Sequence, residues 1–142
     1  MWKDIPKVNY FTMDVRKECN PDLLGDNLKY LKNLDFSSYN VIDVDAYGIP
    51  IKQFKEIFAN ETLKAKTIIF FTFIQLKNNF GALPDEMLID LGYSEAMIKK
   101  IPSVFKKAGF EKFCEWLAKN GITIIYYIKR IDKIYGYFKI KG

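Results

Sequence analysis

The sequence predicts one α/β domain, spanning residues 1–142, in which a mostly parallel, Rossmann-like sheet is flanked by helices. Two observations lead to this expectation. Apolar segments at residues 40–44 and 67–74 are separated by an amphipathic helical pattern, at the spacing of a right-handed crossover between parallel strands. The chain then ends in two β-type segments, at residues 122–128 and 134–140, which are spaced as an antiparallel hairpin. With 49% hydrophobic residues, the 142-residue chain can fill one core.

The first part of the chain contains two predicted strands that end in acids. Residues 8–13 are β-branched or aromatic, and this short strand ends at Asp14. Leucines near helical spacing then predict a helix that begins at Asp26 or Asn27 and continues to Leu34. The second strand, at residues 40–44, leads into acidic residues as well.

The second part of the chain alternates helices with strands. Pro50 suits the first turn of a helix that ends near residue 60. Residues 67–74 are apolar without alternation, which is typical of a parallel strand covered by helices on both faces and predicts a doubly wound sheet. A loop at 78–82, a helix at 83–91, a helix capped by Ser94 and interrupted at Pro102, and a helix at 110–117 then precede the hairpin.

Composition excludes several kinds of chemistry. The chain has no histidine, which removes Ser/His and Cys/His nucleophiles and the commonest metal ligand. Cys19 and Cys114 are too far apart in sequence to suggest a zinc site or a disulfide framework. No segment approaches the roughly 18 apolar residues of a membrane span, and the N-terminus lacks the apolar core of a secretion signal, so we expect a cytoplasmic protein with no membrane partner.

Positive charge is concentrated in the last third of the chain. Residues 99–142 carry eleven Lys or Arg residues against three acids, a net of +8, whereas the whole chain has a net charge of +5. This asymmetry favours a polyanionic partner such as RNA or DNA, contacted by Lys129, Arg130 and Lys133 of the hairpin. A lysine-rich, solvated surface is the alternative interpretation.

The segment from Tyr39 to Pro50 is the most informative one for function. Its apolar strand runs directly into Asp43, Asp45, Tyr47 and a glycine turn. In open α/β sheets, ligands bind outside the carboxyl ends of the strands. We therefore expect Asp45 and Tyr47 to form a site at this rim, with Asp14 at the end of a neighbouring strand.

These motifs resemble those of class I S-adenosylmethionine-dependent methyltransferases. Asp14 resembles the acid that binds the ribose hydroxyls of the cofactor, and Leu24-Gly25-Asp26-Asn27 resembles the motif whose acid contacts adenine. Asp45-Ala46-Tyr47-Gly48 is similar to the catalytic loop of the amino-directed nucleic-acid methyltransferases, D-P-P-Y or D-P-F/Y-G. In those enzymes the acid and a backbone carbonyl accept hydrogen bonds from the target amine, and the aromatic ring stacks on the base.

The sequence departs from that family at two places. Ala46 stands where the family has proline, so the loop loses a residue of fixed φ. The chain begins at what corresponds to the second strand, so we expect the first strand and the glycine-rich loop to be lacking. A sheet without that strand has a free edge, which predicts a homodimer or a partner chain that completes the sheet.

Three functional hypotheses follow from the sequence. In the first, the resemblance implies an enzyme that methylates an exocyclic amine of a nucleic-acid base, with Asp45 and Tyr47 at the target. Its S-adenosylmethionine would be bound by Asp14, Asp26 and Asn27. In the second, the chain is a non-catalytic module of the same fold that binds nucleic acid or a protein. In the third, Asp43, Asp45 and Tyr47 hold a divalent ion.

Overall fold

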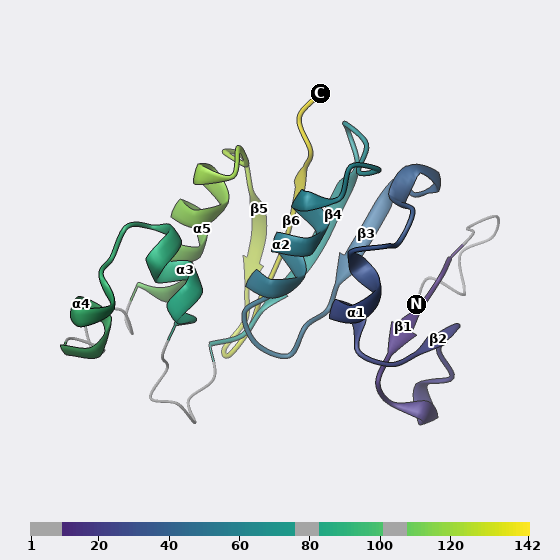
Figure 1. The fold of residues 1–142 in the computed structure, drawn as a ribbon, viewed down its shortest axis with the longest axis horizontal. Coiled ribbons are helices and arrows are strands. Elements are labelled where there is room, and N and C mark those ends of the chain that lie inside the picture. Colours follow the sequence, from purple (N-terminus) through teal and green to yellow (C-terminus); the bar gives the residue numbers. More distant parts are fainter. Residues whose placement is uncertain (1–9, 76–82, 101–107) are drawn as a thin grey trace.

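The computed structural model describes residues 10–75, 83–100 and 108–142, and within them the chain has a mixed α/β fold (Figure 1). Two sheets contain the strands β1 (Met13–Asp14), β2 (Leu23–Leu24), β3 (Val41–Val44), β4 (Ile68–Phe73), β5 (Tyr126–Lys129) and β6 (Ile134–Lys139). Five α-helices accompany them: α1 (Asn27–Leu31), α2 (Ile51–Ala59), α3 (Asp85–Asp90), α4 (Glu95–Lys100) and α5 (Gly109–Lys119). Short 3-10 helices lie at Lys17–Cys19 and Phe36–Ser38.

The larger sheet has the strand order β3-β4-β6-β5. β3 pairs with β4 in parallel, and β6 pairs antiparallel with both β4 and β5. β3, β4 and β5 therefore run in one direction. β6 lies between β4 and β5 and runs in the opposite direction. The predicted parallel pair and the predicted terminal hairpin are confirmed, but the sheet as a whole is small and mixed. Within the described residues no strand pairs with the outer edge of β3, so a second chain at that edge stays a prediction.

The strand that ends at Asp14 belongs to a separate sheet, which corrects one sequence expectation. β1 has only two residues and pairs in parallel with β2, so that Asp14 lies opposite Leu24. The Asp22 carboxylate accepts hydrogen bonds from the backbone N–H and the hydroxyl of Thr12, at 2.7 and 2.8 Å. These local bonds fix β1 against β2. The beginning of the predicted strand, residues 8 and 9, lies outside the described residues.

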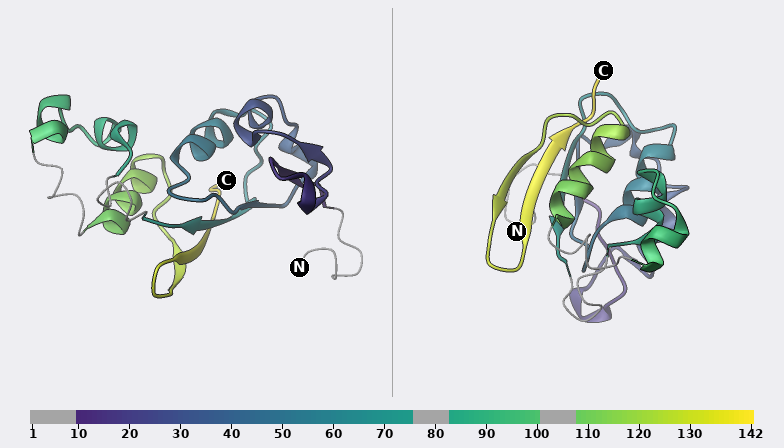
Figure 2. Two further views of the ribbon diagram at one scale, coloured as in Figure 1. Left: turned by 90° about the horizontal axis from the view of Figure 1, so that it is seen from below. Right: turned by 90° about the vertical axis from the view of Figure 1, so that its left-hand side faces the viewer.

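The described helices cover one face of the larger sheet only, as both views in Figure 2 show. Within the described residues the sheet is thus covered on one face, whereas a doubly wound sheet has helices on both faces. Alternate residues of β4, namely Ile69, Phe71 and Phe73, are buried toward the helices. On the other face Ile68 is only half-buried, so an unbroken apolar sequence does not mean burial on both sides here.

Helix boundaries follow local capping. The Asp26 side chain caps α1 by accepting a hydrogen bond from the N–H of Leu28 at 3.0 Å, and α1 ends at Leu31, earlier than predicted. The predicted cap at Ser94 is confirmed, because its Oγ accepts a hydrogen bond from the N–H of Met97 at 3.3 Å. The predicted loop at 78–82 and the interruption at Pro102 lie outside the described residues. Among the residues that are described, no helix combines the length and apolarity needed to cross a membrane.

A polar network joins three helices beside the core. The buried Trp116 of α5 donates from Nε1 to a carboxylate oxygen of Asp90 in α3, at 2.9 Å. Lys55 of α2 forms an ion pair with the same oxygen at 2.7 Å. Partial desolvation opposes ionisation of Asp90, but the hydrogen bonds from Lys55 and Trp116 outweigh it, so the pKa of this carboxyl is lowered.

Candidate functional site

The turn after β3 holds Tyr47 out into solvent. Gly48 has a φ of +122°, a conformation that side-chain-bearing residues rarely adopt. Its carbonyl accepts a hydrogen bond from the N–H of Ile74 at 2.9 Å, which ties the turn to the end of β4. The Tyr47 side chain is 83% exposed. Because neither burial nor packing accounts for this ring, its position favours contact with a ligand.

Asp45 points across the carboxyl ends of the two parallel strands. One of its carboxylate oxygens accepts a hydrogen bond from the hydroxyl of Thr72 in β4, at 2.8 Å. Thr72 is one of the buried polar residues of the chain, and this bond satisfies its hydroxyl. The acid predicted at this rim is therefore held in place by a neighbouring strand.

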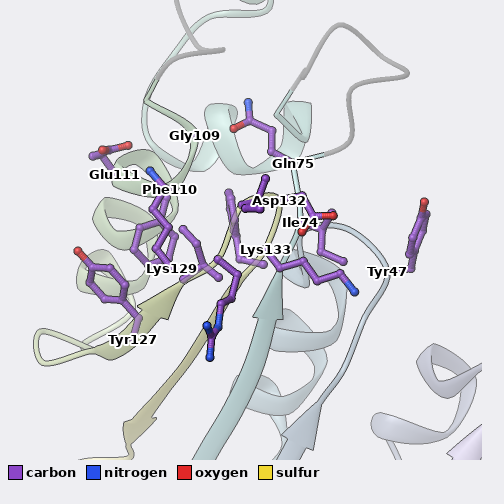
Figure 3. A pocket seen from close by; sticks show the side chains of 14 residues that line it. Tyr47, Ile74, Gln75, Gly109, Phe110, Glu111, Tyr127, Lys129, Asp132 and Lys133 are labelled. Carbon is purple, nitrogen blue, oxygen red and sulfur yellow. The ribbon is translucent and has the colours of Figure 1, made fainter.

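A cavity of about 510 Å³ opens beside this turn. The end of β4, the beginning of α5 and the β5–β6 hairpin loop form its walls (Figure 3). Tyr47 lies at one side of it and Tyr127 at the other, with the hairpin loop between them. The remaining lining residues are Phe73, Ile74, Gln75, Gly109, Phe110, Glu111, Lys129, Arg130, Ile131, Asp132, Lys133 and Ile134.

The structure thus brings together two groups that were predicted separately. Tyr47 was inferred from a strand end, and Lys129, Arg130 and Lys133 were inferred from the charge pattern; all four line this cavity. The hairpin turn is closed by a hydrogen bond from the N–H of Arg130 to the carbonyl of Lys133, at 2.7 Å.

The electrostatic character of the cavity is mildly basic. Three cationic side chains of the hairpin face two acids, Glu111 and Asp132, among the lining residues. Lys129, Arg130 and Asp132 are exposed, so salt screens their interactions strongly. The cavity therefore suits an anionic ligand that also offers a flat surface to its aromatic side chains.

Asp14, the expected ribose ligand, is already occupied within the chain. Its Oδ1 accepts hydrogen bonds from the backbone N–H and the Nε of Arg16, at 2.8 and 3.2 Å, and its Oδ2 accepts one from Nη2 at 3.0 Å. The hydrogen bond from the Arg16 side chain is the main reason that the pKa of Asp14 is lowered to about 2. A carboxylate has roughly four acceptor positions, so about one remains for the two hydroxyls of a ribose.

Asp26 and Asn27 lie close to Asp14, because the N–H of Gly25 donates to the Asp14 carbonyl at 2.9 Å. However, the Asp26 carboxylate caps α1, and Asn27 is the first residue of that helix. None of these three residues lines the cavity beside Tyr47. The described residues therefore do not fit the S-adenosylmethionine site that the resemblance implies.

Three residues that contribute to the site are not predicted by the sequence. Phe110 and Tyr127 both line the cavity and pack edge to face, with ring centroids 4.8 Å apart, and the hydroxyl of Thr72 donates a hydrogen bond to Asp45. Of the three, only Thr72 has a recognisable sequence signal, because its side chain carries a hydroxyl in a strand segment that is otherwise apolar. Phe110 belongs to the helix predicted at 110–117, and only the tertiary structure brings it to the cavity.

A metal site has no support in the part of the chain that the structure describes. Within residues 10–75, 83–100 and 108–142, no three Cys, Asp or Glu side chains are grouped closely enough to bind a metal ion. Asp43 is exposed in β3 and Asp45 is exposed directly after it, so these two neighbours supply only two carboxylates.

Comparison with known proteins does not assign this chain to a family. No protein-family model matches it, and no curated protein matches its sequence. Its function must therefore be inferred from the geometry described above.

Proposed function

We propose that this chain is a methyltransferase-like module that binds nucleic acid without transferring a methyl group. The observation that carries the proposal is that exposed Tyr47 and the cationic side chains of Lys129, Arg130 and Lys133 line one cavity. An aromatic ring beside flexible cations suits a nucleotide, since the ring stacks on a base while the cations contact phosphates.

Two features support the relation to methyltransferases. Strands β3, β4 and β5 of the larger sheet share one direction, and β6, the second strand of the hairpin, runs antiparallel to them. The Asp45-Ala46-Tyr47-Gly48 turn follows β3 directly, and Asp45 is oriented by Thr72. This end of the sheet keeps the residues that would contact a target base. The acid that would bind the cofactor ribose, Asp14, instead accepts hydrogen bonds from Arg16.

Nucleic-acid binding is expected to depend on both the ring and the charges. Tyr47→Ala should weaken binding of a fluorescent 12-nucleotide single strand about 5- to 150-fold, the usual range for loss of one stacked base. Replacing Lys129, Arg130 and Lys133 together by Ala should lower the slope of log affinity against log salt by about 2. Fluorescence anisotropy at several salt concentrations measures both effects.

A matched triple variant separates the site from general charge. Lys29, Lys32 and Lys64 are exposed and do not line the cavity, so their replacement by Ala removes the same charge elsewhere. Binding by this variant should resemble that of the unmodified chain. Equal weakening by both triple variants, or normal binding by Tyr47→Ala, would refute the proposed site.

Methyl transfer is the second candidate, because the Asp45–Thr72 hydrogen bond holds a carboxylate where a target amine would bind. We expect no heat when S-adenosylmethionine is titrated to millimolar concentration, since the bonds from Arg16 leave Asp14 too few acceptors. Arg16→Ala removes the two guanidinium bonds and is the informative comparison in calorimetry. Binding by the unmodified chain would overturn the non-catalytic assignment and favour an enzyme.

A further inference from the structure

The face of the β5–β6 hairpin that points away from the helices is rich in tyrosine. Along β6, the residues Ile134, Gly136 and Phe138 are buried, and Tyr135, Tyr137 and Lys139 alternate with them on the opposite face. Tyr126 and Ile128 of β5 lie across from Tyr137 and Tyr135. We call these five outward side chains, those of Tyr126, Ile128, Tyr135, Tyr137 and Lys139, the tyrosine face.

Two rings of the tyrosine face stack on each other and remain partly exposed. Tyr126 and Tyr137 stack with centroids 5.1 Å apart and an interplanar angle of 18°. Their side chains are 57% and 39% exposed, and Ile128 is 64% exposed. An antiparallel sheet with one open face normally presents polar residues there. An exposed aromatic and aliphatic cluster indicates an interaction surface instead.

A basic groove continues the tyrosine face at the end where β6 finishes. This groove has a volume of about 390 Å³, and Tyr126 and Tyr137 form part of its wall. Lys66, Lys139 and Lys141 also line it, and no Asp or Glu among the described residues does. Lys66 is held beside the strand because its N–H donates to the carbonyl of Ile140 at 2.9 Å.

We propose that the tyrosine face and this groove bind a single strand of nucleic acid. Tyr126, Tyr135 and Tyr137 offer rings on which unpaired bases stack, and Lys66, Lys139 and Lys141 neutralise the backbone. Duplex bases are already stacked on each other, so the surface selects single strands. The inference rests on the proposed function and extends the bound strand to a surface separate from the Tyr47 cavity.

Charge favours nucleic acid over a protein as the occupant. The centres of protein–protein interfaces are depleted of charged residues, particularly lysine. Lys139 follows Tyr137 on the same side of β6, and covering its ammonium group without a counter-charge is costly. Phosphate groups supply that counter-charge, and in the part of the chain that the structure describes no lining Asp or Glu competes for the lysines.

The test compares ring variants that keep or remove stacking. The double variant Tyr126→Ala and Tyr137→Ala should bind labelled single strands, of RNA and of DNA, at least 10-fold more weakly in anisotropy titrations. Tyr126→Phe with Tyr137→Phe keeps both rings and should bind like the unmodified chain. Replacing Lys66, Lys139 and Lys141 by Ala should lower the salt slope by about 2, and a 12-base-pair duplex should compete poorly.

The outcomes separate this inference from the proposed function. Normal binding by the Tyr126→Ala, Tyr137→Ala variant, together with weakened binding by Tyr47→Ala, would overturn the inference and leave the cavity proposal intact. Normal binding by all of these variants would refute both. Sedimentation velocity adds a third arm: a dimer that becomes a monomer in the double Ala variant, with unchanged affinity for single strands, would show a self-association surface and overturn the inference. Urea unfolding verifies that each variant is folded.

Discussion

Replacing Phe54 with Ala is expected to lower the free energy of unfolding by about 3–5 kcal/mol. Phe54 lies on the sheet-facing side of α2 and is completely buried. Its ring packs against four others, with centroid distances of 5.5–6.0 Å, from Phe58, Phe71, Phe113 and Phe138. These rings come from α2, β4, α5 and β6, so the truncation leaves a cavity where the helical layer meets the sheet.

The loss is large relative to the whole stability of a domain, which is usually about 5–15 kcal/mol. Urea unfolding followed by circular dichroism measures it. Tyr47→Ala is the matched control, because it removes an aromatic ring of similar size that is exposed, and it should change the free energy of unfolding by less than about 0.5 kcal/mol. A change below 1 kcal/mol for Phe54→Ala would contradict the packing described here.

Replacing Gly136 with Ala is expected to destabilise the fold by about 1–3 kcal/mol through overpacking. Gly136 lies opposite Phe71 in the pairing of β6 with β4. A Cβ atom added to Gly136 would lie 2.4 Å from Cζ and 2.8 Å from Cε1 of the Phe71 ring. Such distances are too short for carbon atoms, so the ring or the strand must move.

A double-mutant cycle tests whether this contact is the cause. Phe71→Leu shortens the side chain over Gly136 and is itself destabilising, because it leaves a cavity in the core. If the clash is with the ring, the double variant will lose less stability than the sum of the two single variants, by more than about 0.5 kcal/mol. Additive effects would place the origin of the Gly136→Ala loss elsewhere.

The parts of the fold that sequence reasoning predicted are those governed by local patterns. The amphipathic spacing of Ile51, Phe54 and Ile57 predicts α2, and the three residues are buried as expected. The apolar runs and the hairpin spacing predict β3, β4 and the terminal strands, and their pairing is confirmed. Each of these signals lies within about twenty consecutive residues.

The errors concern which elements meet in space. An unbroken apolar run at 67–74 is typical of a strand covered on both faces, but burial depends on whether a second helical layer is present, and periodicity carries no information on that. Likewise the acid at the end of β1 has the sequence context of a sheet rim. The Thr12–Asp22 hydrogen bonds nevertheless draw that strand into a separate small sheet.

The candidate site was predictable in its parts and not in its assembly. Tyr47 follows from a strand that ends in a glycine turn, and Lys129, Arg130 and Lys133 follow from the charge asymmetry. That these residues share a cavity depends on the insertion of β6 between β4 and β5, which brings the hairpin loop next to the end of β4. No local pattern encodes such an insertion.

The position of β6 also affects how the chain reaches its native state. This strand is the last in sequence, and yet it is an interior strand that joins β4 to β5. During synthesis, the edge of β4 that pairs with β6 stays open until Ile134–Lys139 has left the ribosome, and its contacts span more than sixty positions, as in Ile68 with Lys139. Late, long-range pairing of this kind slows folding and exposes apolar surface in a partly folded intermediate. Because β6 joins β4 to β5, a chain that stops near residue 130 would leave β5 unpaired with the rest of the sheet.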